Sequence, residues 1–282
     1  MAQYPKVRIT PLGGVDEIGK NLYVIEYEDD ILVVDCGSIF PKEDMLGIDL
    51  VIPDASYLEA NKNRVRGYVF THGHEDHIGA VPYILQQVPA PIWGTRLTLA
   101  LIDLKLREHR VNDIQMNAIV PRDEVKIGQF TVKFVKVSHS IPGACALIIK
   151  CPAGVIVHSG DFKIDFTPVD KEITDLSSLA MAGDAGVLAL LCESTNIERP
   201  GYTMSEKKIG ETFINQFRKA TGFPPIRFQI ECRIQKAKEM LRTPGRTASD
   251  VALQLGFNSL QHFSDTFARL VGISPARWRA GT

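Results

Sequence analysis

The most informative segment of this sequence is Thr71-His72-Gly73-His74-Glu75-Asp76-His77. It directly follows residues 66–70, whose pattern predicts a strand. Three imidazoles and a carboxylate within six residues, on a loop that leaves a strand, can point into one small volume and bind two cations. A chance cluster of histidines on a solvated loop is the alternative, but H-x-H-x-D-H combines alternate and adjacent ligand positions. The segment therefore predicts a metal centre.

Two residues farther along the chain are expected to close this centre. His139 follows a strand predicted at 130–137, and Asp161 follows one predicted at 155–158. Either residue taken alone would more often be structural. Combined with the histidine-rich segment, both are predicted to be metal ligands.

The surrounding pattern predicts an α/β fold, specifically an α+β sandwich, followed by an all-α region. Strands interleave with helices, and the first strands alternate as hairpins do, which argues against an all-parallel sheet. Strands are expected at 7–10, 21–27, 30–34, 66–70, 124–127, 130–137, 145–151, 155–158 and 187–192, and helices at 79–87 and 97–109. Beyond residue 204 the pattern predicts only helices, at 205–220, 226–241, 247–255 and 259–271.

Motifs within residues 1–212 resemble a known family of hydrolases. The H-x-H-x-D-H segment with single His and Asp residues after it, and Asp35 in Val-Val-Asp-Cys-Gly, resemble the metallo-β-lactamase fold. Longer runs resemble the ribonuclease J family, densely over residues 8–212: Leu12-Gly-Gly-Val-Asp-Glu-Ile-Gly-Lys-Asn21, Leu46-Gly-Ile-Asp-Leu-Val-Ile-Pro-Asp54, His139-Ser-Ile-Pro142, Gly160-Asp-Phe-Lys-Ile-Asp-Phe-Thr-Pro168 and Ser194-Thr-Asn196.

This resemblance implies a zinc-dependent hydrolase that cleaves RNA phosphodiester bonds. Two zinc ions about 3.5–4 Å apart would acidify a shared water and neutralise charge on the phosphodiester. Asp76 and Asp161 are the expected catalytic carboxylates. The implied ligands are His72, His74 and His139 for one ion, Asp76 and His77 for the other, and Asp161 as the bridge.

Three further residues are expected to support the ligands. Asp35 is more consistent with an anchor hydrogen-bonded to the histidine loop than with a ligand. Glu193 and Ser194 resemble the first motif of the β-CASP nucleases, whose acidic residue supports the site. Glu193 stands where ribonuclease J usually has aspartate, so the sequence departs from the family pattern there.

The resemblance also implies parts that do not follow in this sequence. In ribonuclease J a β-CASP domain comes next, and the chain later returns with the last histidine ligand. The second zinc site is therefore expected to be weak, a processive exonuclease is not expected, and His158 is interpreted as structural. Apolar surface left uncovered would need the tail or a second chain, so a homo-oligomer is one expected state.

The tail, residues 213–282, is predicted to be a helix–turn–helix module. Its segment 217–278 resembles the C-terminal part of the AraC/XylS family DNA-binding domain, with the first of two units truncated; the match includes Phe217-Arg-Lys-Ala-Thr-Gly-Phe-Pro-Pro225 and Gly272-Ile-Ser-Pro-Ala-Arg-Trp278. Phe263, Phe267 and Leu270 share the core face of the last long helix. Predicted DNA-contacting residues lie off that face: Ser259, Gln261, Asp265 and Arg269. A solvated face of a helical bundle is the alternative.

Charge and cysteine usage fit this division. From residue 218 onward there are eleven basic and four acidic residues, a balance of +7, which leaves −8 for residues 1–217. A basic tail attracts phosphates. The five cysteines form no C-x-x-C pair, and no apolar run is long enough to span a bilayer, so a cytoplasmic protein without a membrane partner is expected.

Two functions from different classes remain open. One is the zinc-dependent ribonuclease; the other is an AraC-type DNA-binding transcription regulator whose N-terminal region is inactive or senses metal. Hydrolysis of a thioester or lactone is disfavoured because the matched runs are those of the nuclease branch. The sequence leaves open whether the fusion is natural or a chimera.

Overall fold

The structure, a computed structural model, describes residues 5–243 and 245–281. It divides into two compact units, Met1–Glu206 and Lys207–Thr282, each with its own hydrophobic core. The boundary expected at residues 212–213 falls inside helix α6 (Lys207–Thr221), all of which belongs to the second unit. None of the described helices is long and apolar enough to cross a membrane.

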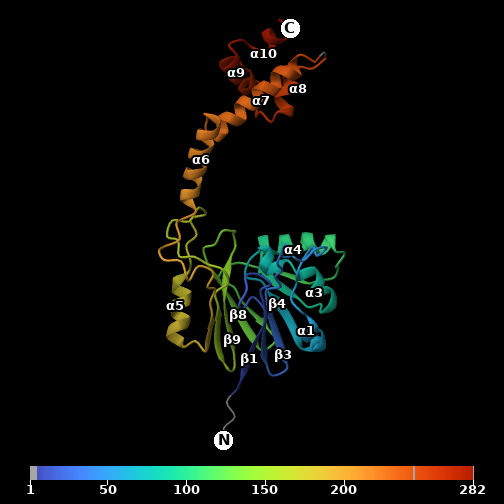
Figure 1. The fold of residues 1–282 in the computed structure, drawn as a ribbon, viewed down its shortest axis with the longest axis vertical. Coiled ribbons are helices and arrows are strands. Elements are labelled where there is room, and N and C mark those ends of the chain that lie inside the picture. Colours follow the sequence, from blue (N-terminus) through green and yellow to red (C-terminus); the bar gives the residue numbers. More distant parts are fainter. Residues whose placement is uncertain (1–4, 244, 282) are drawn as a thin grey trace. The chain divides into compact units, whose positions relative to one another are not determined.

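The first unit contains two sheets packed face to face (Figure 1). One has the order β1-β2-β3-β4-β5-β6, antiparallel from β1 to β3 and parallel from β3 to β6. Its strands are β1 (Val7–Gly13), β2 (Leu22–Tyr27), β3 (Asp30–Val34), β4 (Val65–Val69), β5 (Ile92–Thr95) and β6 (Met116–Ile119).

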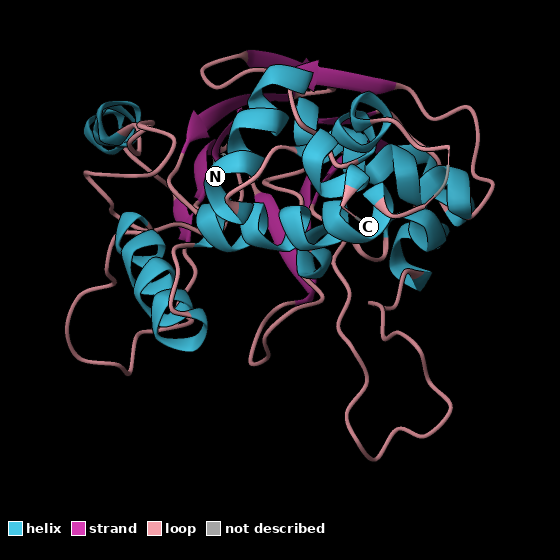
Figure 2. Ribbon diagram, turned by 90° about the horizontal axis from the view of Figure 1, so that it is seen from above, coloured by secondary structure: helices cyan, strands magenta, loops and turns pink. Residues whose placement is uncertain are grey.

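The second sheet has the order β11-β10-β9-β8-β7 and is antiparallel except for the parallel pair β10 and β11. Every strand of the described residues, magenta in Figure 2, belongs to one of these two sheets. The strands of the second sheet are β7 (Glu124–Ile127), β8 (Phe130–Lys136), β9 (Cys145–Cys151), β10 (Gly154–His158) and β11 (Ala189–Leu191).

Helices cover the outer faces of both sheets, so the unit is an α/β/β/α sandwich. The side chains of strand β8 show that both faces of its sheet are covered. Phe130, Val132 and Phe134 point into the core between the two sheets, whereas Val135 points to the opposite face and packs near α5. Helix α5 (Leu176–Ala185) covers that outer face. The first sheet is covered by α1 (Ser56–Ala60), α3 (Val81–Gln87) and α4 (Arg96–Glu108).

The sandwich confirms the predicted fold class, with corrections to its elements. The helix expected at 79–87 begins at Val81, because Gly79 ends a separate short helix, α2 (Glu75–Ile78), where its N–H donates to the Glu75 carbonyl (2.7 Å). The sequence reading missed α1, α5, β5 and β6. The two missed strands are four residues each, and a window that short carries no clear period.

The regular elements of the second unit are all helices among its described residues. They are α6, α7 (Pro225–Leu241), α8 (Ala248–Gln254), α9 (Leu260–Val271) and α10 (Pro275–Ala280). Phe263 and Phe267 of α9 are fully buried, and Leu270 packs beside them, as the spacing predicted. The α8–turn–α9 pair forms the expected helix–turn–helix.

Thr247 is expected to stabilise this unit through a capping box at the start of α8. The Asp250 N–H donates to Thr247 Oγ1 (3.2 Å), and the Thr247 N–H donates to Asp250 Oδ2 (3.0 Å). Thr247→Ala should therefore lower the free energy of unfolding by about 1 kcal/mol. This free energy is measured by urea unfolding in a Trp93→Phe background, with the fluorescence of Trp278 as the signal. Exposed Ser249→Ala is the control, and an equal loss there would contradict the assignment.

Candidate metal centre

The histidine-rich segment occupies the carboxyl end of β4, where the chain turns into α2. Phe70, Thr71 and His72 are fully buried, and His74 is the N-cap of α2, so Asp76 and His77 fall in its single turn. Backbone hydrogen bonds hold this turn: the Cys36 N–H donates to the His77 carbonyl (2.8 Å), and the Ile78 N–H to the His74 carbonyl (2.9 Å). The ligand loop is fixed on the core rather than free in solvent.

Two other loops bring His139 and Asp161 to the same place. The Cys145 N–H donates to the Thr71 carbonyl (2.9 Å), which joins the start of β9 to the histidine loop. The Lys163 N–H donates to the Ser138 carbonyl (2.8 Å), which joins the loop of His139 to that of Asp161. Three loops from both sheets therefore meet at one edge of the sandwich.

The first ligand set consists of His72, His74, His139 and Asp161, whose ligand atoms all lie within 4.8 Å of one another. His74 Nδ1 is 3.0 Å from His72 Nε2 and 3.1 Å from His139 Nε2. Asp161 Oδ2 is 3.9 Å from His72 Nε2 and 3.7 Å from His139 Nε2. A tetrahedron with bonds of about 2.0–2.1 Å has edges of about 3.3–3.4 Å, so these atoms fit the sphere of a tetrahedral cation.

The second ligand set consists of Asp76, His77 and Asp161. His77 Nε2 lies 3.3 Å from Asp161 Oδ1 and 3.6 Å from Asp76 Oδ2. Asp161 thus turns Oδ2 toward the first set and Oδ1 toward the second. One carboxylate with an oxygen in each set has the geometry of a bridging ligand.

Asp35 is fully buried next to the candidate ligands and contacts both Thr71 and His77. It accepts the Thr71 N–H at Oδ1 (2.8 Å), and it accepts the Thr71 hydroxyl at Oδ2 (2.8 Å). His77 Nδ1 lies 2.8 Å from the same Oδ2. Once the ring is neutral, an imidazole that donates from Nδ1 to a carboxylate keeps its lone pair on Nε2, the nitrogen that faces the second ligand set.

Thr71 extends this orientation to the first set, a role the sequence reading missed. Its Oγ1 lies 3.1 Å from His72 Nδ1 while its hydroxyl donates to Asp35, so it can accept the proton of His72 Nδ1. His72 Nε2 is then left with a lone pair for a cation. The only signal in the sequence was the position of Thr71 between the strand and the first histidine.

The electrostatics favour neutral imidazoles at His72 and His139, an ionised Asp161 and, without a cation, a protonated His77. Although burial lowers the pKa of His77, Asp35 and Asp161 outweigh it and raise that pKa to about 10, so a cation in the second set would displace a proton from this ring. Burial lowers the pKa of His72 to about 2 and also lowers the pKa of His139. Although burial raises the pKa of Asp161, the neighbouring His77, His72 and His139 outweigh it and hold that pKa well below the usual range. Neutral imidazole and carboxylate are the forms that bind metal.

A cavity of about 670 Å³ opens beside the second ligand set. Glu193 and Ser194 line it, and Glu193 Oε1 accepts the Phe162 N–H (3.2 Å) beside Asp161. The sequence reading also missed Asn21, whose Nδ2 lies 3.2 Å from His77 Nε2. Among the described residues, no lysine or arginine lines the cavity, whereas five carboxylates do: Asp16, Glu17, Asp76, Asp161 and Glu193.

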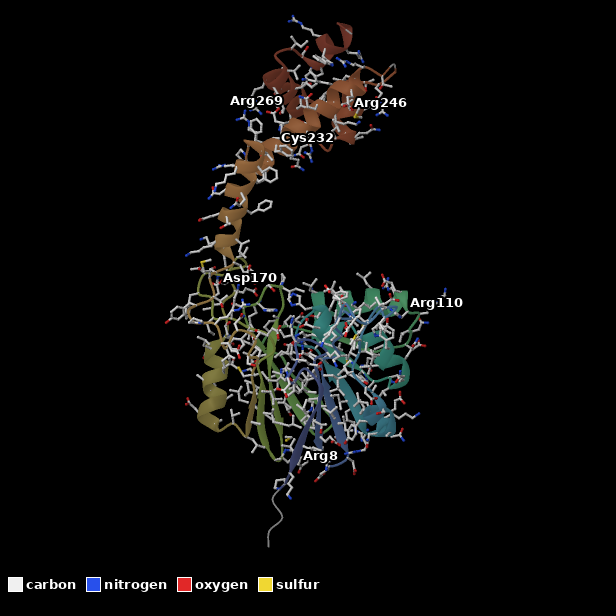
Figure 3. All side chains as sticks on the ribbon, viewed as in Figure 1. Arg8, Arg110, Asp170, Cys232, Arg246 and Arg269 are labelled. Atoms are coloured by element: carbon white, nitrogen blue, oxygen red, sulfur yellow. The ribbon has the colours of Figure 1, made fainter. Side chains whose placement is uncertain are left out.

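The proposed DNA-contacting residues lie on helix α9 of the second unit. Gln261, Asp265 and Arg269 are exposed on one side of the helix, at spacings of four residues, and Figure 3 labels Arg269. Gln261 Nε2 donates to Asp265 Oδ1 (2.9 Å) within that row. Ser259 is the N-cap, and its Oγ accepts the His262 N–H (3.1 Å), so its first role is structural.

Comparison with known proteins agrees with this geometry. The family model of the metallo-beta-lactamase superfamily matches residues 15–181. The chain belongs to the metallo-beta-lactamase superfamily. A model of a helix-turn-helix domain matches residues 210–281 of this superfamily member.

The curated relatives of this metallo-beta-lactamase superfamily member include ribonuclease J. This chain is 44% identical over 224 residues to ribonuclease J of Thermus thermophilus, and the alignment covers 77% of this chain and 39% of the relative. This chain is also 47% identical over 245 residues to ribonuclease J 1 of Streptococcus pyogenes, and that alignment covers 86% of this chain and 43% of the relative. The chain thus spans about two fifths of the length of these relatives.

A solved structure shares the fold alone. A protein of unknown function from Enterococcus faecalis V583 aligns with a TM-score of 0.54 at 16% identity, covering 96% of this chain and 68% of that one.

Proposed function

We propose that the first unit is a zinc-dependent phosphodiesterase that cleaves single-stranded RNA. The observation that carries this proposal is the placement of Asp161, with one carboxylate oxygen in each of two ligand sets. Similarity to ribonuclease J supports RNA as the substrate. Nitrogen and carboxylate ligands in a tetrahedral arrangement favour zinc.

The chain's own residues would orient the reaction. Two bound cations would supply an acidified water and offset the charge that develops on the phosphodiester. Asp161 would keep the two ions at a fixed separation. Asp76, whose Oδ2 belongs to the second set, would accept a hydrogen bond from the attacking water and orient it.

The cavity makes substrate binding dependent on metal. Five carboxylates line the cavity, and within residues 5–243 and 245–281 no lysine or arginine does, so the metal-free cavity would repel a phosphodiester. Bound cations would reverse the sign of the local charge. RNA affinity, and not turnover alone, is therefore expected to require metal.

The two sites are expected to differ in affinity. Four protein groups surround the first position and three surround the second, with Asp161 shared. The second ion would have to take more of its ligands from water, so calorimetric titration of the chelator-treated protein should show a tight and a weaker step. The weaker site limits the activity of this chain under low zinc.

A direct test combines metal counting with RNA cleavage. Purified protein should contain zinc, and it should cleave a 5′-labelled single-stranded RNA that it leaves intact after treatment with EDTA. Restoring zinc should restore cleavage. Protein that holds two zinc ions but cleaves neither RNA nor a simple phosphodiester would contradict the proposal.

A second function, duplex DNA binding, is supported by the second unit. A helix–turn–helix match, a balance of +7 from residue 218 onward, and the exposed row on α9 favour it. This function does not depend on the metal centre. His74→Ala should leave it unchanged.

Arg269→Ala is expected to weaken duplex binding by about fivefold, close to 1 kcal/mol, because it removes one cation from the exposed face of α9. The slope of log Kd against log salt should fall by about 1 if the contact is to phosphate. Fluorescence anisotropy at 50–200 mM salt measures both. Glu231→Gln, a charge change on α7, is the control; equal binding by wild type and Arg269→Ala would count against the α9 interface.

A further inference from the structure

His158 ends strand β10 beside the metal centre without belonging to either ligand set. It is 6% exposed and lines the cavity. The Gly160 N–H donates to His158 Nδ1 (3.1 Å). That nitrogen is therefore already occupied as an acceptor, and among the described residues neither ligand set includes His158.

Gly160 makes the turn that delivers Asp161. Its φ of 56° lies in the left-handed region, and a Cβ there would meet the Cys145 carbonyl oxygen at 3.0 Å and Thr71 Cβ at 3.1 Å. The turn is thus pressed against the loop that carries the histidines, with no room for a side chain. Its N–H is buried and requires an acceptor, because an unpaired buried donor costs about 1–3 kcal/mol.

The backbone N–H and carbonyl of Gly160 are held by different side chains. The Gly160 carbonyl accepts a hydrogen bond from Ser159 Oγ (2.6 Å), and the same Oγ accepts the Glu193 N–H (3.1 Å). The Gly160 N–H has one acceptor among the described residues, His158 Nδ1. The peptide plane between residues 159 and 160 is therefore set by the imidazole.

The ring of His158 is itself held in place. Tyr23 packs against it edge to face, with ring centroids 5.0 Å apart, and the Tyr23 hydroxyl donates to the Gly14 carbonyl (3.3 Å). Burial lowers the pKa of His158 to about 4, so the ring is neutral near pH 7 and Nδ1 keeps its lone pair. A fixed, neutral ring can serve as a stable acceptor.

We propose that His158 is a positioning residue: its Nδ1 fixes the Gly160 turn and thereby keeps one Asp161 oxygen in each ligand set. The inference rests on the proposed metal centre. Loss of the acceptor should let the turn rotate. Because Asp161 is shared, affinity for the more weakly held ion should suffer most.

Three substitutions separate this role from simple packing. His158→Asn places an amide oxygen where Nδ1 lies and can still accept the Gly160 N–H. His158→Leu has no acceptor, and His158→Gln places its oxygen nearer the position of Nε2. Zinc titration of each chelator-treated variant by calorimetry gives both affinities without using activity, and circular dichroism checks that each variant folds.

The weaker zinc affinity should fall by about 10- to 100-fold in His158→Leu and His158→Gln, and stay within about threefold of wild type in His158→Asn. If His158→Leu does not fold, the weaker zinc affinities of His158→Gln and His158→Asn are compared instead, and that comparison tests the inference. Wild-type affinities in both variants lacking the acceptor, or an equal loss in His158→Asn, would overturn the inference. Wild-type protein that binds two zinc ions without cleaving RNA would refute the nuclease proposal alone.

Discussion

Asp161→Asn is expected to reduce RNA cleavage by about 10³-fold. The change keeps the size of the side chain but removes the negative charge that lies between the two ligand sets. A neutral amide presents one oxygen, so it could not place an oxygen in each ligand set as Asp161 does. Steady-state cleavage of single-stranded RNA at saturating zinc measures the loss.

The control for this substitution is Asp170→Asn. Asp170 is 42% exposed, pairs with Lys136 at 3.4 Å and is labelled in Figure 3. It is absent from both ligand sets, so its variant should cleave RNA at the wild-type rate. An Asp161→Asn variant that retained activity within tenfold of this control would remove the bridging carboxylate from the mechanism.

Asp35→Asn is expected to weaken zinc binding at the second set by about 10- to 100-fold. Asp35 receives donors at both oxygens, from the Thr71 N–H at one and from the Thr71 hydroxyl and His77 at the other. In either orientation an asparagine turns its NH₂ group toward one of these donors. If that group faces His77, the imidazole proton is driven to Nε2, where a cation needs the lone pair.

Calorimetric zinc titration measures this effect, with activity as a second readout. Asp123→Asn is the control, since Asp123 accepts the Val120 N–H in an exposed turn remote from the ligand sets. Unchanged zinc affinity in folded Asp35→Asn would show that the tautomer of His77 is fixed by another group.

The clustering of residues 72–77 could be predicted from the sequence because their chemistry is local. Residues 72–77 form one short segment that follows β4 and runs into α2. Their residue types and spacing therefore already limit the directions in which their side chains can point. His139 and Asp161 are distant in sequence, and their expected roles came from their positions after strands and from the family resemblance. The structure brings their ligand atoms together with those of the loop.

The supporting contacts could not be predicted in the same way. Thr71 hydrogen-bonds to Asp35 between the loops that follow β4 and β3, and His158 contacts the backbone of Gly160. Neither contact leaves a pattern in the sequence. The first depends on the distance between the residues that follow β3 and β4, and the second depends on the backbone conformation of Gly160. Asp35 was expected as an anchor from the resemblance, but its two-sided bonding to Thr71 and His77 required coordinates.

The same limit applies to the helical unit. The i, i+4, i+7 spacing identified the buried face of α9 correctly, because burial follows directly from helical period. It could not show that Ser259 caps the helix or that Gln261 and Asp265 pair with each other. Those contacts compete with any role in reading DNA.

Anomalous diffraction at the zinc edge, on crystals grown with zinc, tests the central claim most directly. The account predicts two peaks about 3.5–4 Å apart, one among His72 Nε2, His74 Nδ1 and His139 Nε2, and both in contact with Asp161. A map without peaks there, or a structure in which His139 and Asp161 turn away from residues 72–77, would contradict it.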